Sequence, residues 1–342
     1  MKKRTRKRLS DVLGQQGEES YFLSPTPSFQ FIHSGATILD KVIGGGWALS
    51  RVSNVVGDKA TGKTLLSIEA MINFSRMFTK KKIKIRYGES ESAFDDGYGE
   101  ALGMPLDRVS RPKEPLSTVE DFYNDLSEYL EDTTEGGLYI LDSLDALSDA
   151  AEIDKDIDKN SFGAGKAKKM SEVFRKIIRK VEASNCHLMI ISQVRDNIGV
   201  SFGQKYKRSG GRALDFYASQ IIYLAHKGEI QKTRRGIKRT IGVDIKVKCT
   251  KNKVGLPFRT CEFPILFGYG IEDICASIDW LVANKQTDKT GLSVKELKNI
   301  RDDAINSKLE DVADMRGSLS DCVERGWKEV EREFLPTRRK YE

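Results

Sequence analysis

The stretch GDKATGKT, residues 57–64, determines the expected fold together with the segments on either side of it. It follows the apolar run RVSNVVG (51–57), which is typical of a buried strand. It precedes TLLSIEAMINFSRMF (64–78), whose apolar residues recur at helical spacing. A strand, a G-x-x-x-x-G-K-[ST] loop and a helix in this order form a phosphate-binding loop, with the helix N-terminus adding the positive end of its dipole. The residues expected to hold the phosphates are Gly57, Asp58, Lys59, Ala60, Thr61, Gly62, Lys63 and Thr64.

Three side chains are expected to act on the nucleotide phosphates and Mg²⁺. Lys63 neutralises charge on the β- and γ-phosphates, and Thr64 ligates Mg²⁺. Asp142 ends the apolar run GLYIL (137–141), as expected of an acid that orients Mg²⁺ through water. Taken alone, an Asp after a strand is also a good loop residue.

Two further strand ends carry polar side chains that suit hydrolysis. Glu91, in RYGESESAFDD (86–96), could polarise the attacking water, and Glu89 is its rival. Gln193 follows CHLMIIS (186–192) and could contact the γ-phosphate. Loss of that phosphate by hydrolysis would then change the segment that follows Gln193. The alternative for Gln193 is a satisfied buried amide.

A phosphate-binding loop alone does not separate a kinase, a GTPase and an ATP-driven machine. A guanine-reading N-K-x-D motif would follow a strand. Here Asn252 and Lys253 are followed by Gly255 where the motif requires Asp. The sequence therefore disfavours a GTPase.

The wider pattern predicts an α/β fold. Apolar runs alternate with amphipathic segments such as TVEDFYNDLSEYLED (118–132) and KKMSEVFRKIIRKVEAS (168–184), which predicts a mainly parallel central sheet covered on both faces. Later strands joined by shorter turns predict an antiparallel extension. The expected strands are RVSNVVG (51–57), KIKIRYGE (82–89), GLYILDS (137–143), CHLMIISQ (186–193), QIIYLAH (220–226), IGVDIKVKC (241–249) and RTCEFPIL (259–266).

Composition excludes several classes of protein. The 342 residues are 39% apolar and 31% charged, enough for a real core and roughly two domains. No apolar stretch approaches the roughly 20 residues that span a bilayer, and the N-terminus lacks a secretory signal, so a cytoplasmic location without a membrane partner is expected. The five cysteines are scattered without a CxxC pair, and the three histidines do not cluster near them, which argues against disulfides and a zinc site.

Basic residues gather at 2–8, 166–169, 205–212 and 232–239, although the net charge is only +7. Such runs indicate a polyanionic partner, or else solvated faces. Two long segments, 152–170 and 195–214, combine glycines, lysines and one apolar aromatic each, Phe162 and Phe202. Cations for phosphates and an aromatic for bases predict a groove for single-stranded DNA, the alternative being a pair of disordered surface loops.

These motifs occur in the order of a known family. GDKATGKT (57–64), LYILDSLDAL (138–147), SQVRDNIGVSFG (192–203), SGGRALDFYAS (209–219), KCTKNKVGLPF (248–258) and EFPILFGYGI (262–271) together resemble the bacterial RecA type of homologous recombinase over about residues 31–272. The resemblance implies a filament on single-stranded DNA that holds ATP between protomers, searches for homologous duplex and exchanges strands.

The resemblance also assigns residues. It makes Lys63, Thr64 and Asp142 the phosphate and magnesium residues and selects Glu91 over Glu89 as the water-activating acid. Asp95 and Tyr98 fall where the family contacts adenine, and Gln193 where it couples the γ-phosphate to the second DNA loop. Lys251 and Lys253 match a pair that reaches the neighbouring protomer's ATP; the alternative is a solvated strand end. Phe216 matches an interface aromatic; the alternative is a core residue. The expected DNA contacts are Phe162, Gly163, Lys166, Lys168, Lys169, Arg175, Arg195, Phe202, Gly203, Lys205, Lys207, Arg208, Gly210, Gly211 and Arg212.

The expected organisation is a basic N-terminal helix and linker (1–30) that docks on a neighbouring protomer, a RecA-like core (31–272) and a small, mainly helical C-terminal domain (273–342). The last domain lies outside the resemblance, and PTRRKYE (336–342) replaces the acidic tail of many bacterial members. This divergence suits a phage-encoded member. The alternative function is a DNA-stimulated ATPase motor or a recombination accessory without strand exchange.

Overall fold

The structure is a computed structural model that describes residues 29–79, 83–91, 94–133, 135–150, 164–196, 206–208, 211–306, 309 and 311–336. For residues 164, 195, 196, 206–208, 211 and 212 it describes the backbone alone. The expected N-terminal helix and linker, and most of the two expected DNA loops, lie outside the described residues.

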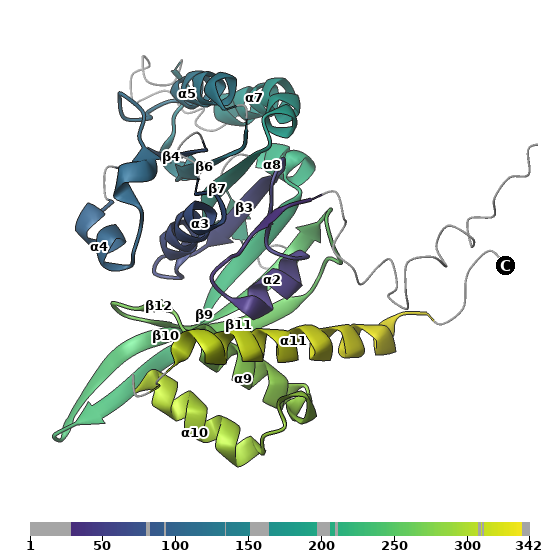
Figure 1. The fold of residues 1–342 in the computed structure, drawn as a ribbon. Coiled ribbons are helices and arrows are strands. Elements are labelled where there is room, and N and C mark those ends of the chain that lie inside the picture. Colours follow the sequence, from purple (N-terminus) through teal and green to yellow (C-terminus); the bar gives the residue numbers. More distant parts are fainter. Residues whose placement is uncertain are drawn as a thin grey trace, which may run out of the picture.

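The elements alternate between strands and helices through the first two thirds of the chain (Figure 1). The strands are β1 (Phe31–Ile32), β2 (Trp47–Ala48), β3 (Val52–Gly57), β4 (Lys84–Glu89), β5 (Val109–Ser110), β6 (Gly137–Asp142), β7 (Cys186–Asp196), β8 (Tyr206–Arg208), β9 (Gln220–Arg234), β10 (Ile237–Asn252), β11 (Thr260–Leu266) and β12 (Gly270–Ile271). The α-helices are α2 (Thr37–Ile43), α3 (Lys63–Met77), α4 (Asp96–Ala101), α5 (Val119–Asp132), α7 (Ala164–Ala183), α8 (Gly211–Tyr217), α9 (Asp273–Ala283), α10 (Val294–Ile305) and α11 (Val312–Phe334), with 3₁₀ turns at Leu106–Arg108, Leu144–Ala146 and Thr287–Thr290.

One large sheet organises the chain, in the strand order β12-β11-β10-β9-β3-β7-β6-β4-β5, with β8 paired to β7. The strands from β9 through β3, β7, β6 and β4 to β5 pair in parallel, whereas β9, β10, β11 and β12 pair antiparallel. The predicted mainly parallel α/β core with an antiparallel extension is therefore confirmed.

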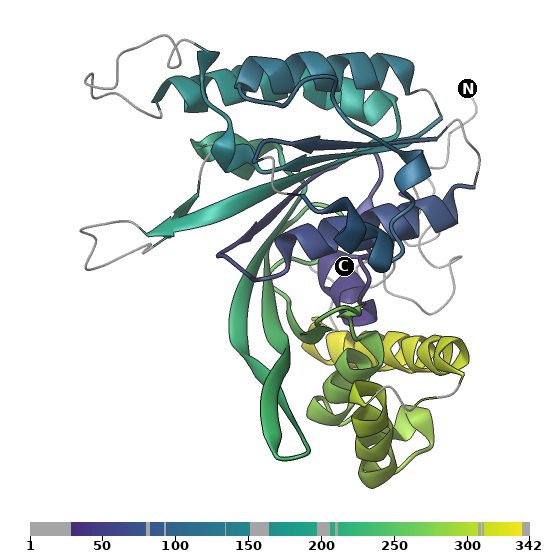
Figure 2. The same ribbon diagram turned by 90° about the vertical axis from the view of Figure 1, so that its left-hand side faces the viewer.

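Both faces of the parallel strands are buried, which explains their continuous apolar sequences. In β6, Leu138 and Ile140 join the core beneath α2 and α3, while Tyr139 and Leu141 join the core beneath α5 and α7. Figure 2 shows α5 and α7 on one side of the sheet and α3 on the other. The phosphate-binding strand β3 lies between β7 and β9, so the loop after it stands at the middle of the sheet edge.

The antiparallel part contains an unusually long hairpin. β9 has 15 residues and β10 has 16, and they pair from Gln220 and Asn252 out to Arg234 and Ile237. The outer half of the hairpin extends away from the body of the molecule (Figures 1 and 2). No side chain between 225 and 241 is buried, so burial in the core does not stabilise this half of the hairpin.

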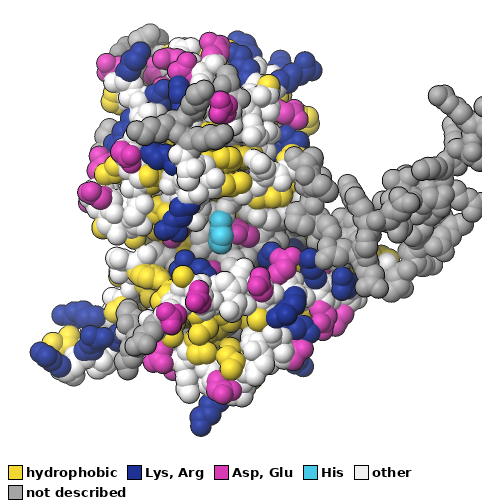
Figure 3. Space-filling model, in the orientation of Figure 1, with side chains coloured by type: hydrophobic (Ala, Val, Ile, Leu, Met, Phe, Trp, Pro, Cys, Tyr) yellow, Lys and Arg dark blue, Asp and Glu magenta, His cyan; other side chains and the backbone are white. Residues whose placement is uncertain are grey.

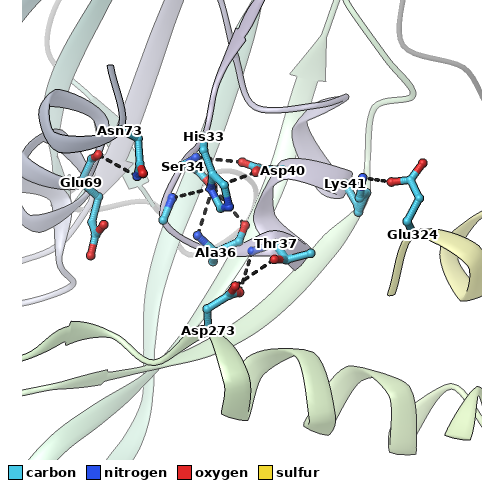
Figure 4. Close-up of polar contacts among 11 residues, drawn as sticks. His33, Ser34, Ala36, Thr37, Asp40, Lys41, Glu69, Asn73, Asp273 and Glu324 are labelled. Carbon is cyan, nitrogen blue, oxygen red and sulfur yellow. Dashed lines mark hydrogen bonds and ion pairs between the residues drawn. The ribbon is translucent and has the colours of Figure 1, made fainter. Parts of the chain in front are cut away.

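Helix α9 packs against α2 and β11, α11 packs against α9 and α2, and α10 packs against α9. Polar contacts tie this junction together (Figure 4). The backbone N–H and the hydroxyl of Thr37 both donate to the carboxylate of Asp273, at 2.6 and 2.8 Å, and Lys41 pairs with Glu324. Whether residues 273–342 form a separate domain stays a prediction.

The third of these helices begins earlier than the sequence predicts. The segment LSDCVERGWKEVEREFL (319–335) has helical spacing, but α11 starts at Val312 and passes through Gly317 and Ser318. Glycine and serine favour a break because of their poor helix propensity. Val312 and Met315 pack against the core, and this tertiary contact outweighs the local preference.

No helix among the described residues is long and apolar enough to cross a membrane.

Candidate active site and nucleic-acid interface

The phosphate-binding loop has the conformation that its glycines allow. Gly62 lies in the left-handed region with φ 84°, and a Cβ there would come within 2.5 Å of Ile265 Cδ1. The hydroxyl of Thr61 and the ammonium of Lys63 both donate to the carbonyl oxygen of Asp58, at 2.8 and 2.7 Å. The loop is thus closed by its own polar groups, and Lys63 lies at the first turn of α3.

Burial lowers the pKa of Lys63, and the negative charges of Asp142 and Asp58 oppose that change. An ammonium group removed from water in this way interacts strongly with a multiply charged anion, because the screening by solvent is weakened. Lys63 therefore meets the requirement for a residue that neutralises phosphate charge.

Thr64 and Asp142, predicted as the magnesium residues, come together. The hydroxyl of Thr64 donates to Asp142 Oδ2 at 2.8 Å, and the hydroxyl of Tyr87 donates to the same oxygen at 2.9 Å. Burial raises the pKa of Asp142, while these two hydrogen bonds lower it. Hydroxyl and carboxylate oxygens are the hard ligands that Mg²⁺ prefers, and a nearby cation would favour the charged form of Asp142, so the residues fit Mg²⁺ with ATP.

Glu91 and Gln193 lie in contact although 102 residues separate them. Gln193 Nε2 donates to Glu91 Oε1 at 2.9 Å, and the hydroxyl of Ser143 donates to the same oxygen at 2.7 Å. The backbone N–H of Gln193 donates to Asp145 Oδ2 at 2.6 Å. The end of β7 is therefore linked to the segments after β4 and β6, at the carboxyl edge of the sheet where ligands bind in such folds.

Glu89, the rival of Glu91, has a structural partner. Its Oε1 accepts a hydrogen bond from the backbone N–H of Phe94 at 2.6 Å, which ties the end of β4 to the segment before α4. Glu91, by contrast, is bonded to the side chain expected to sense the γ-phosphate. The choice of Glu91 over Glu89 as the acid near the attacking water stays a prediction.

The predicted adenine contacts, Asp95 and Tyr98, lie at the start of α4. Asp95 caps this helix by accepting a hydrogen bond from the backbone N–H of Tyr98 at 3.2 Å. The Tyr98 side chain is 42% exposed, and burial of the remainder raises its pKa. An exposed aromatic ring held on a capped helix is available to stack against a base.

Lys251, Lys253 and Phe216 gather at a different place on the sheet. Lys251 of β10 pairs with Ile221 of β9, and Ile221 pairs in turn with Asn54 of β3. These lysines therefore lie toward the beginning of β3. Both ammonium groups donate to carbonyl oxygens at the end of α8, Lys251 to Phe216 at 2.9 Å and Lys253 to Phe216 at 3.3 Å. The Phe216 ring is 71% exposed, which excludes the alternative of a core residue.

The predicted DNA contacts divide into three groups. Lys168 and Arg175 are exposed on α7, whereas Lys169 is paired with Glu120 at 2.7 Å. Lys166 is only 9% exposed, and its ammonium donates to the carbonyl oxygens of Leu144 and Asp145, so its charge is directed inward. The backbones of Arg195, Lys207, Arg208, Gly211 and Arg212 lie on β7, β8 and α8, and Phe162, Gly163, Phe202, Gly203, Lys205 and Gly210 fall outside the described residues.

The sequence reasoning missed three polar residues of this site: Tyr87, Ser143 and Asp145. Each orients a predicted residue, Tyr87 holding Asp142, Ser143 holding Glu91 and Asp145 holding the backbone of Gln193. Ser143 and Asp145 stand directly after the strand that ends in Asp142, which is the signal that could have identified them.

The central parallel sheet, the loop after β3 and the acid after β6 together define a P-loop ATP-binding protein. A family model described as the RecA N-terminal domain matches residues 12–272. The protein RecA of Synechocystis sp. is 33% identical over 250 residues, which are 72% of this chain and 67% of that protein. The protein RecA of Rippkaea orientalis is 31% identical over 300 residues, 86% of this chain and 81% of that protein.

The chain belongs to the RecA family and is a RecA-type recombinase, an ATP-binding and DNA-binding protein. The protein RecA of Trichodesmium erythraeum, 34% identical over 251 residues, is a third relative of the same kind.

Proposed function

We propose that this chain assembles as a helical filament on single-stranded DNA, hydrolyses ATP between protomers and exchanges the bound strand with a homologous duplex. The observation that carries the proposal is the separation of two sets of nucleotide residues on one protomer. Lys63, Thr64, Asp142 and Glu91 lie at the carboxyl edge of the sheet, whereas Lys251 and Lys253 lie toward the other edge.

The strand register gives the size of this separation. Lys253 donates its backbone N–H to Ser219, which itself donates to Val52 at the beginning of β3. From Val52 to Gly57 the strand advances about 17 Å, at about 3.3 Å per residue. The Lys253 ammonium is also held at the end of α8, so it is poorly placed for the phosphates of its own protomer. A neighbouring protomer that docks against Phe216 would bring its own phosphate-binding loop to these lysines.

Gln193 supplies the link between nucleotide and DNA. Its amide donates to Glu91, and β7 continues from Gln193 to Asp196, directly before the expected second DNA loop. A γ-phosphate competes with the Glu91 carboxylate for the Gln193 amide, because both offer anionic acceptor oxygens at the same edge of the sheet. Loss of that phosphate returns Gln193 to Glu91 and shifts the start of the loop.

Mg²⁺, when bound with ATP, neutralises charge that develops on the phosphates. Thr64 and Asp142 would hold it, with Tyr87 orienting Asp142. Glu91 accepts a proton from the attacking water, and Lys63 stabilises the phosphate oxygens.

Exposed cations such as Lys168 and Arg175 bind the DNA backbone, together with Arg195, Lys207, Arg208 and Arg212. We further propose that residues 1–30 dock on a neighbour and that 273–342 form a separate domain.

Joint-molecule formation between a circular single strand and a homologous linear duplex tests the proposal. We expect joint molecules only with ATP, Mg²⁺ and homology, and a helical array on single-stranded DNA in electron micrographs. Lys63→Ala is the control that abolishes hydrolysis. DNA-stimulated ATPase without joint molecules would refute strand exchange and favour the motor or accessory function.

A further inference from the structure

The tip of the β9–β10 hairpin carries an excess of positive charge. Between Ile230 and Val243 the chain has five cations and no acid, and the cations are Lys232, Arg234, Arg235, Lys238 and Arg239. Figure 3 shows Lys and Arg side chains gathered on this projection at the lower left. Glu229, the nearest acid toward the base, already accepts hydrogen bonds from Thr240 at 2.8 Å and Gln231 at 3.3 Å. The stretch from Ile230 to Val243 therefore contains no carboxylate of its own that could balance these charges.

Local structure makes this charge costly to the free protein. The register sets Lys232 directly opposite Arg239, and like charges in that arrangement destabilise a strand pair. Arg235 occupies the first turn position with φ 52°, followed by Gly236 with φ 76°. Asn, Asp or Gly would suit this turn better than arginine. The hairpin thus keeps two features that oppose its own stability, and a bound polyanion would compensate for both.

The cations lie on both faces of the ribbon and at its turn, with more of them on one face. Because side chains alternate along a strand, Lys232, Arg234 and Arg239 share one face of the ribbon and Lys238 lies on the other, with Arg235 at the turn. Arg234, Arg235, Lys238 and Arg239 form no ion pair with any carboxylate in the described part of the chain. A two-stranded ribbon fits the major groove of B-DNA, where phosphates stand on both sides.

Single-stranded sites differ because they add aromatic side chains on which bases stack. Residues 225–241 contain no Phe, Tyr or Trp. We propose that the hairpin tip, residues 232–239, is a binding site for double-stranded DNA that enters a groove of the duplex. Its use in capturing the homologous duplex rests on the proposed function, whereas the binding itself does not.

Salt dependence of duplex binding by the full-length chain tests this site. The probe is a fluorescein-labelled 30-base-pair duplex, followed by anisotropy across a NaCl series. The variant is Arg235→Asn, Lys238→Gln and Arg239→Gln combined. We expect it to lower the slope of log K against log salt by about 2 to 3, at about 0.9 for each lost phosphate contact, and to weaken binding at least about tenfold.

The design separates binding from folding. Asn suits the positive φ of position 235, and neutralising Arg239 removes the like-charge pair, so thermal stability should not fall. Arg235→Asn alone, with an expected slope change of about 0.9, serves as the milder variant. The matched control is Lys176→Gln, Arg179→Gln and Lys180→Gln, which removes three exposed charges from α7 on the opposite side of the molecule and should leave most of the slope intact.

Two results would overturn the inference. One is a hairpin variant that binds duplex with the affinity and slope of the control. The other is unchanged duplex binding with loss of binding to an oligoglutamate peptide. That result would assign the tip, and the hollow of about 420 Å³ that it shares with Phe267 and Tyr269, to an acidic protein partner. If the wild-type protein binds duplex through the hairpin but forms no joint molecules, the proposed strand exchange is refuted and the duplex-binding site is still supported.

Discussion

Lowering the pH should destabilise the fold through one buried histidine. His187, at the beginning of β7, is 0% exposed. Its Nδ1 lies 2.7 Å from the carbonyl oxygen of Ala48, which can only accept, so Nδ1 carries the proton and donates. Its Nε2 then accepts from the hydroxyl of Ser53 at 2.9 Å. The site holds the neutral ring, and protonation at Nε2 would remove the Ser53 hydrogen bond.

Burial lowers the pKa of His187 to about 4, from an ordinary value of 6.5. The unfolded chain therefore binds a proton between about pH 6.5 and pH 4 that the folded chain does not, so stability falls as the pH falls through this window. At about 1.4 kcal/mol per pKa unit, the loss amounts to about 3 kcal/mol by pH 4. The raised pKa values of the Asp40 and Asp142 carboxyls act in the opposite sense.

A comparison of wild type with His187→Asn isolates this contribution. The Asn amide can still donate to Ala48 but does not titrate, and the smaller side chain lowers stability at pH 7 by about 1–3 kcal/mol. Urea unfolding from pH 7 to pH 4, followed by tryptophan fluorescence, gives both stabilities. The ring centroid of Trp47 lies 6.1 Å from that of His187, so this residue contributes to the signal. We expect the stability of wild type relative to the variant to fall by about 3 kcal/mol toward pH 4, so that the variant becomes as stable as wild type or more stable. A difference in stability that does not change with pH would show that the fold does not hold His187 in its neutral form.

Three further predictions concern the site and the interface. Asp142→Asn removes a buried carboxyl whose pKa is raised, so that the free energy of unfolding of the wild type falls as the pH rises above about 3.8. Thermal unfolding of the nucleotide-free variant at pH 7 should therefore show equal or higher stability. Its rate of ATP hydrolysis should drop by about 100-fold or more. Gln193→Ala should keep nucleotide binding but lose the stimulation of hydrolysis by single-stranded DNA; an ATPase assay with full stimulation would contradict the link to Glu91. Phe216→Ala should change the stability of the isolated chain by less than about 0.5 kcal/mol, because the ring is exposed, yet raise the concentration needed for filament assembly about tenfold in light scattering.

Lys166 illustrates where the sequence is insufficient. It stands in a basic run and was expected to contact DNA, but its ammonium turns inward to the carbonyl oxygens of Leu144 and Asp145. Lys168, two residues away, is exposed. The turn of α7 relative to the segment after β6 decides which lysine faces solvent, and that relation comes from packing between elements far apart in the chain.

The phosphate-binding loop and the strands that carry Asp142 and Gln193 can be predicted from short stretches of residues. These follow from local rules: glycines where the backbone must wrap, and apolar runs where a strand is buried on both faces. No such stretch predicts that Gln193 donates to Glu91 or that Tyr87 orients Asp142. The separation of about 17 Å along the sheet between Lys253 and its own phosphate-binding loop also appears only in the folded chain. The physical reason is that strand order and register arise from the pairing of distant segments, whose energies no single stretch of residues contains.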